Sequence, residues 1–147
     1  MKKYLVIGNP IEHSLSPKLH NYWIKVNKIN ANYEKKKLNE NEIESLIKDV
    51  KDKKIGGFNV TVPFKQKVIP YLDEITPQAK ETQSVNTIYL GANGTVGHNT
   101  DIDGFESSLS DLDLQGRSSF EVRNKNIFIL GAGGVVPSII YALKKLQ

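Results

Sequence analysis

Cysteine is absent from the 147 residues of the chain, which excludes disulfide bonds and thiolate metal sites. The three histidines, His13, His20 and His98, have no carboxylate partner at a spacing typical of zinc ligands, so no metal site is predicted. No apolar run approaches the roughly 18 residues that span a bilayer. The apolar residues 4–7 end at once in Gly8, too early for a signal-peptide core. We therefore expect a cytoplasmic protein without a membrane partner.

Positive charge is in slight excess, with a net charge of +4 at pH 7. Lysines cluster at residues 35–37 and 51–54, but acidic residues surround both clusters and no basic motif alternates with aromatic residues. No nucleic-acid partner is expected. A mild positive field would instead help to attract a small anionic ligand.

Strands and helices are predicted to alternate along the chain. Apolar runs predict strands at residues 4–7, 32–38 and 55–62, and a hairpin over residues 85–97. Helices are predicted to begin at Ser16, Asn39 and Thr76. The pattern predicts an α/β fold, in which a mixed, largely parallel sheet is flanked by helices.

The helix after Asn39 has the strongest pattern. Ile43, Leu46, Ile47 and Val50 recur at i, i+3, i+4 and i+7, which gives one apolar face. The helix after Ser16 has a similar apolar stripe, formed by Leu19, Tyr22, Trp23 and Val26.

The last third of the chain differs in organisation. A helix is expected from Asp101 to about Leu109, then a polar linker over residues 111–124. Residues 126–130 predict a buried strand, which a glycine-rich turn joins to a helix over residues 135–146. We predict a first domain over residues 1–110 and, over 125–147, the first β-α unit of a Rossmann-type dinucleotide-binding domain.

Ser14 and Ser16 form the first polar cluster, directly before the predicted helix. Free backbone N–H groups and the helix dipole favour an anion there, and the two hydroxyls could hold a carboxylate. Alternatively, Ser16 only caps the helix.

The second cluster is Asn59, Thr61 and Lys65. Asn59 and Thr61 share one face of the predicted strand, and Pro63 ends the strand and turns Lys65 back toward that face. An amide, a hydroxyl and an ammonium there suit a ligand rich in hydroxyl groups. Taken alone, Lys65 would be an ordinary surface lysine.

Asn86 and Asp101 belong to two further polar clusters, at residues 84–87 and 97–104. Asp101 has two interpretations: an N-cap for the helix behind it, or a partner of Lys65 in a proton-handling pair.

A dinucleotide phosphate could bind at the turn between the last strand and helix. The candidate residues are Gly131, Ala132, Gly133, Gly134 and Val135. The third glycine of G-x-G-x-x-G is replaced by Val136, and Pro137 occupies the first helical turn.

Five motifs in one order resemble the shikimate dehydrogenase family over nearly the whole chain. They are the segments at residues 8–21, 59–65, 86–87, 97–104 and 131–134. Gln83 and Ser84 depart from the Gly-Ala usual in the family, and Pro137 stands where a basic residue is common.

The resemblance implies specific roles. Ser14 and Ser16 would hold the substrate carboxylate, while Asn59, Thr61, Asn86 and Asp101 would hold its ring hydroxyls. Lys65 would be the catalytic acid/base, paired with Asp101. The implied activity is reversible, NADP-dependent reduction of 3-dehydroshikimate to shikimate, a step toward chorismate and the aromatic amino acids, with NAD not excluded as cofactor.

The length of the chain departs from the family, because residues 125–147 hold one β-α unit where a dinucleotide domain needs several. We expect a fragment that is inactive alone. Two alternatives stay open: a non-catalytic module that binds shikimate or quinate, and a quinate dehydrogenase. The sequence does not fix the oligomeric state, and a homodimer is one option.

Overall fold

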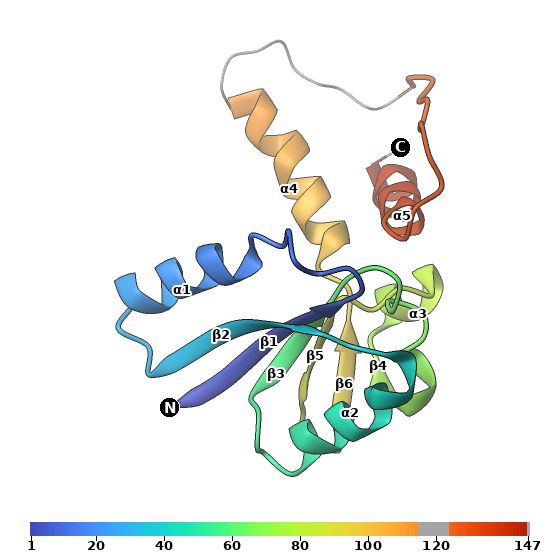
Figure 1. The fold of residues 1–147 in the computed structure, drawn as a ribbon. Coiled ribbons are helices and arrows are strands. Elements are labelled where there is room, and N and C mark those ends of the chain that lie inside the picture. Colours follow the sequence, from blue (N-terminus) through green and yellow to red (C-terminus); the bar gives the residue numbers. More distant parts are fainter. Residues whose placement is uncertain (115–123, 147) are drawn as a thin grey trace.

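A six-stranded mixed sheet forms the centre of the computed structural model, which describes residues 1–114 and 124–146 (Figure 1). The strand order is β2-β1-β3-β5-β6-β4. The strands are β1 (Lys2–Gly8), β2 (Ala31–Lys37), β3 (Gly57–Val60), β4 (Glu74–Ile75), β5 (Thr87–Leu90) and β6 (Thr95–His98). The helices are α1 (Ser16–Val26), η1 (Glu40–Glu42), α2 (Ile43–Lys51), η2 (Ile69–Tyr71), α3 (Pro77–Thr82), α4 (Asp101–Leu114) and α5 (Val136–Leu146).

The sheet is mixed and largely parallel, as predicted. Strand β1 pairs in parallel with both β2 and β3, and β4 pairs in parallel with β6. Strand β5 runs antiparallel to β3 and to β6, and the β5–β6 hairpin turns at residues 91–94. The short strand β4 was not predicted. The carboxyl ends of β1, β3 and β6 therefore lie at the same end of the sheet as the amino end of β5.

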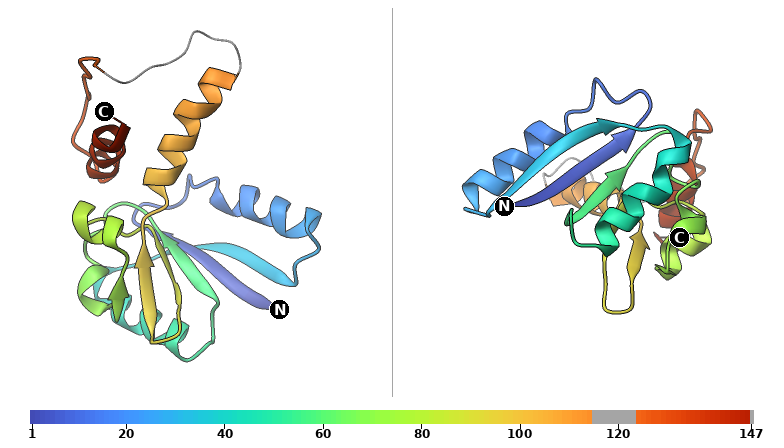
Figure 2. Two further views of the ribbon diagram at one scale, coloured as in Figure 1. Left: turned by 180° about the vertical axis from the view of Figure 1, so that it is seen from behind. Right: turned by 60° about the horizontal axis from the view of Figure 1, so that its bottom comes forward.

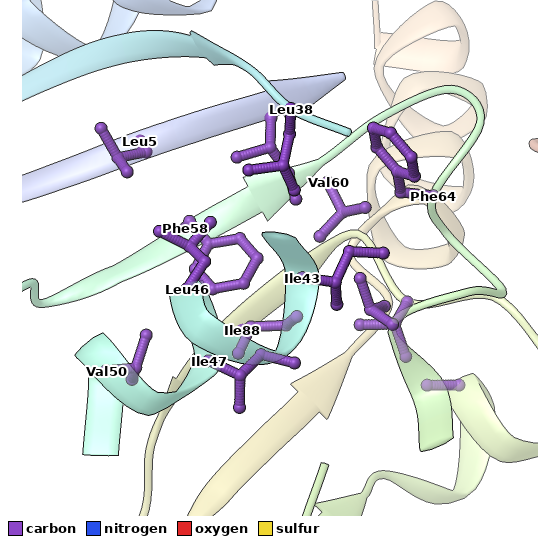
Figure 3. Close-up of a cluster of buried hydrophobic side chains, with 14 residues drawn as sticks. Leu5, Leu38, Ile43, Leu46, Ile47, Val50, Phe58, Val60, Phe64 and Ile88 are labelled. Carbon is purple, nitrogen blue, oxygen red and sulfur yellow. The ribbon is translucent and has the colours of Figure 1, made fainter. Parts of the chain in front are cut away.

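Helix α2 covers one face of the sheet and closes the main core (Figure 3). The four apolar residues predicted to face inward, Ile43, Leu46, Ile47 and Val50, are all buried. The helix is preceded by η1, where the Glu42 carboxylate accepts a hydrogen bond from the Asn39 N–H at 2.8 Å. This bond satisfies one of the donors that a helix start leaves unpaired.

Helix α1 lies against β2 and buries none of its residues. The predicted apolar stripe is present, but Leu19 and Trp23 are each 48% exposed and Tyr22 is 63% exposed. Ser16 is the first helical residue rather than the cap: Leu15 occupies the N-cap position and provides no side-chain hydrogen bond.

Beyond the sheet, the chain departs from prediction in two places. Helix α4 continues to Leu114, through the first residues of the predicted linker, and residues 115–123 of that linker lie outside the described residues. Residues 126–130 were predicted to form a buried strand, and this was wrong. They pair with no other strand in the described part of the chain, and Phe128 is 93% and Leu130 96% exposed. A strand needs a neighbour to satisfy its backbone groups, and residues 1–114 and 124–146 provide none for this segment.

Helix α5 forms as predicted and packs against α4 and α3 (Figures 1 and 2). Asn99 Nδ2 donates a hydrogen bond to Ser138 Oγ at 2.8 Å, and both side chains are buried. The predicted division into domains at residue 110 stays a prediction. None of the helices in the described residues is long and apolar enough to cross a membrane.

Candidate active site

Lys65 and Asp101 form an ion pair at the end of the sheet where β3 and β6 have their carboxyl ends. Lys65 Nζ lies 2.6 Å from Asp101 Oδ2, and the two side chains are 13% and 24% exposed. Lys65 follows β3, and Asp101 is the first residue of α4. Partial burial weakens the solvent screening of the two charges, so the attraction exceeds that of an ordinary surface pair.

The remaining partners of Asp101 show that its side chain does not cap α4. Asn86 Nδ2 donates to Asp101 Oδ1 at 2.8 Å, so both carboxylate oxygens accept hydrogen bonds from other elements. The Asp101 N–H is instead satisfied by Asn99 Oδ1 at 3.0 Å. Of the two interpretations of Asp101, the partner of Lys65 is the one that the geometry supports.

Asn59 and Asn86 belong to one polar network beside this pair. Asn59 Nδ2 donates to Thr87 Oγ1 at 2.9 Å and to the Asn86 carbonyl at 3.1 Å. Asn86 Oδ1 accepts from Thr87 Oγ1 at 3.0 Å and from the Thr100 N–H at 2.9 Å. The side chains are therefore held in fixed orientations before any ligand arrives.

Ser14, Ser16 and Thr61 line one cavity of about 280 Å³. The remaining lining residues are Val6, Pro10, Ile11 and His13. Ser14 Oγ accepts a hydrogen bond from the Ser16 N–H at 3.4 Å, at the start of α1. The cavity combines three hydroxyl-bearing residues and a helix N-terminus without an acidic residue in its first turn.

A second cavity of about 530 Å³ lies between Lys65 and the glycine-rich turn. Ala132, Gly133 and Gly134 line it, together with Val62, Pro63, Gln66, Val136 and Pro137. Gly131 has φ +117°, a conformation that side chains disfavour, and a Cβ on Gly131 or Gly133 would meet no atom within 4 Å. Both cavities border the short segment from Thr61 to Lys65.

The structure thus brings most of the predicted site residues to one end of the sheet. Gly131 and Val135 of the predicted phosphate turn are not among the residues that line the cavity beside Lys65. Lys65, Asp101, Asn86 and Asn59 are joined by hydrogen bonds, while the serines and the glycine-rich turn line the two cavities. Sequence reasoning missed Tyr33, whose hydroxyl donates to Asn59 Oδ1 at 2.6 Å. The sequence predicted a strand over residues 32–38, but the register of β2 against β1, on which the contact of Tyr33 depends, was not readable from it.

Comparison with known proteins agrees with this geometry. Residues 6–88, more than half of the chain, match the family described as the shikimate dehydrogenase substrate binding domain. The chain belongs to this family. A shikimate dehydrogenase (NADP(+)) from Pelagibacter ubique is 58% identical over 146 residues, which are 99% of this chain and 53% of that protein.

Solved structures of shikimate dehydrogenases share the fold. The enzyme from Aquifex aeolicus is 41% identical with a TM-score of 0.88, and the match covers 99% of this chain and 53% of that one. The Thermus thermophilus enzyme, solved in complex with shikimate, is 29% identical with a TM-score of 0.85 over 99% of this chain and 53% of that one. The chain spans about half the length of the relatives it matches.

Proposed function

We propose that this chain supplies the substrate-binding half of an NADP-dependent shikimate dehydrogenase, which reversibly reduces 3-dehydroshikimate to shikimate. The observation that carries the proposal is the Lys65–Asp101 pair, with Nζ and Oδ2 2.6 Å apart. Lys65 lines one cavity, and the nearby Thr61 lines another of different chemistry. Membership of the family and the NADP-dependent relatives support it.

The cavity at the start of α1 suits the substrate carboxylate. Ser14 and Ser16 offer hydroxyl donors, and the amino end of α1 favours negative charge. Hydrogen bonds to a charged acceptor are about twice as strong as those between neutral groups. We therefore assign the anion to these two serines.

The polar network beside Lys65 suits the ring hydroxyls. Thr61 lines the serine cavity, and Asn86 and Asp101 are hydrogen-bonded to each other. Asn59 and Asp101 offer oxygen acceptors, and Lys65 offers further N–H donors besides the one directed at Asp101. Such a mixture of donors and acceptors fits a ligand with several hydroxyl groups.

Lys65 is the group that we assign to proton transfer. A ring carbonyl that receives a hydride needs one proton to become a hydroxyl, and the Lys65 ammonium donates it. In the reverse direction the neutral amine takes that proton back. Asp101 orients the ammonium and balances its charge, because one oxygen holds Nζ while Asn86 fixes the other.

The glycine-rich turn fits the phosphates of a dinucleotide. Ala132, Gly133 and Gly134 of the turn line one cavity with Lys65, and Gly131, with its positive φ, is suited to a turn that lets a phosphate approach the backbone. Gly134 O accepts a hydrogen bond from Ser84 Oγ at 3.4 Å, which ties the turn to the substrate domain. Bound NADPH supplies the hydride.

The test is turnover in a chimera. Residues 1–147 are joined to the remaining half of the Pelagibacter ubique relative, and oxidation of NADPH by 3-dehydroshikimate is measured. The proposal predicts shikimate dehydrogenase activity that also runs in reverse with shikimate and NADP. A folded chimera that binds NADPH but reduces no 3-dehydroshikimate would refute it.

A further inference from the structure

The Tyr33 side chain extends from the edge strand β2 across β1 and contacts Asn59 of the candidate site. It lies on the edge strand β2, opposite Tyr4 of β1, whereas Asn59 lies on β3, opposite Val6 of β1. Neighbouring strands are about 4.8 Å apart, so the phenol ring spans the width of β1. Its hydroxyl donates to Asn59 Oδ1 at 2.6 Å.

Helix α1 fixes the position of Tyr33. Asn21 bonds to both backbone groups of Tyr33, accepting from its N–H at 3.0 Å and donating to its carbonyl at 2.7 Å. His20 stacks on the ring with centroids 4.1 Å apart and the planes inclined by 7°. Tyr33 is only 5% exposed, so its hydroxyl has little freedom to choose another partner.

The bond from Tyr33 defines the orientation of the Asn59 amide. Both N–H groups of Asn59 Nδ2 are used, one by Thr87 Oγ1 and one by the Asn86 carbonyl. Turning the amide over would place its oxygen against the Asn86 carbonyl, where two acceptors would repel. The donor from Tyr33 therefore stabilises the one arrangement in which every partner matches.

From Asn59 the hydrogen bonds continue, link by link, to the ion pair. Thr87 Oγ1 accepts from Asn59 and donates to Asn86 Oδ1 at 3.0 Å. Asn86 Nδ2 then donates to Asp101 Oδ1 at 2.8 Å, and Asp101 Oδ2 holds Lys65. A chain of this kind is cooperative, because each bond polarises the next.

We propose that Tyr33 is a positioning residue for shikimate binding, which acts by holding Asn59 with its oxygen available as an acceptor. The inference rests on the proposed function. Among the described residues Asn59 Oδ1 accepts only the bond from Tyr33, so its second lone pair is open to a ligand hydroxyl. Asn59 thus selects a ring hydroxyl that donates a hydrogen bond.

Burial supports the role of Tyr33 as a constant donor. Desolvation raises the pKa of its phenol above the usual value, so the hydroxyl keeps its proton throughout the neutral range.

The first test examines the ligand-free chain by ¹H–¹⁵N NMR. Tyr33→Phe removes one oxygen atom and leaves the ring. The matched control is Tyr4→Phe, on the paired position of β1, whose hydroxyl makes no hydrogen bond within residues 1–114 and 124–146. The proposal predicts that Tyr33→Phe shifts the side-chain amide signals of Asn59 and Asn86, whereas Tyr4→Phe leaves both in place. Unchanged Asn59 signals in Tyr33→Phe would overturn it.

The second test measures shikimate affinity in a double-mutant cycle. Tyr33→Phe should weaken binding about threefold to tenfold, the effect of one hydrogen bond. In an Asn59→Ala background the same change should have no effect, because Tyr33 would have nothing left to position. Equal losses in both backgrounds would mean that Tyr33 acts through packing alone.

The two tests separate failure of this inference from failure of the proposed function. If the unchanged chain is folded but binds no shikimate, the proposed function fails, while the Asn59 signals still decide whether Tyr33 orients the amide. If the chain binds shikimate and Tyr33→Phe changes neither the signals nor the affinity, only the role of Tyr33 is wrong.

Discussion

The Lys65 ammonium lies 2.6 Å from the Asp101 carboxylate, although 36 residues separate them along the chain. The topology explains this proximity. Lys65 follows β3 and Asp101 follows β6, and these two strands have their carboxyl ends at the same end of the sheet. The Lys65 carbonyl also accepts a hydrogen bond from the Val85 N–H at 2.9 Å. The fold therefore brings the two residues together, although they lie far apart in the sequence.

Replacing Lys65 by alanine should abolish turnover while leaving shikimate affinity within about tenfold, because proton transfer is needed only in the transition state. The measurement is steady-state kinetics in the chimera, together with shikimate titration of the 147-residue chain. Lys67→Ala is the matched control: Lys67 pairs with Glu40 and is 42% exposed. An unchanged kcat in Lys65→Ala would remove Lys65 from the mechanism.

Replacing Ser14 or Ser16 by alanine should each lower shikimate affinity about tenfold, because each change removes a hydrogen bond to a charged group. The methyl ester of shikimate, which lacks the charge, should lose much less affinity in the same variants. Ser45→Ala, in a separate groove beside α2, is the control. Equal losses for acid and ester would show that the serines do not recognise the carboxylate.

Features that depend on one segment alone could be predicted from the sequence, whereas features that depend on contacts between distant segments could not. Helix α2 and its buried face were predicted from the spacing of Ile43, Leu46, Ile47 and Val50. This was possible because the periodicity of apolar residues within one helix indicates which of its faces is buried. The strand predicted at residues 126–130 was wrong, since an apolar run becomes a strand only beside another strand. The apolar stripe of α1 was recognised, but its exposure depends on how α1 lies on β2.

The candidate site divides in the same way. Asn59 and Thr61 were placed on one face by alternation, and Lys65 and Asp101 were paired as one of two options. Tyr33 was not found as part of the site, and Thr87 was placed in a polar cluster without its partner Asn59, because both contributions arise from register between strands. Register depends on the whole sheet, which a single sequence does not display.

Acid should weaken the fold through Asp73. The pKa of Asp73 is lowered to about 2. The largest cause is the hydrogen bond from Lys51, and the next are the hydrogen bonds from the Thr95 N–H and hydroxyl. Because the folded-state pKa lies below the unfolded value of about 3.9, the stabilisation is full above that value and is lost as pH falls toward 2. Asp73→Asn should therefore be less stable than the unchanged chain at pH 7, and the gap should close across this window. Urea unfolding at several pH values measures the gap, and a gap that does not depend on pH would contradict the account.

Core and surface apolar residues should respond differently to truncation. Ile7 is fully buried in the main core, so Ile7→Ala should cost about 2–5 kcal/mol of unfolding free energy. Phe128 is 93% exposed, so Phe128→Ser should change it by less than about 0.5 kcal/mol. Urea unfolding of both variants checks the contrast. A large loss in Phe128→Ser would mean that residues 126–130 are buried in solution.

The most direct test of the central claim is a shikimate titration of the 147-residue chain followed by ¹H–¹⁵N NMR. The account predicts saturable shifts confined to Ser14, Ser16 and the segment from Asn59 to Lys65, with Asn86 and Asp101, whether or not NADPH is present. A folded chain that shows no shifts, or shifts centred on the groove beside α2, would contradict it.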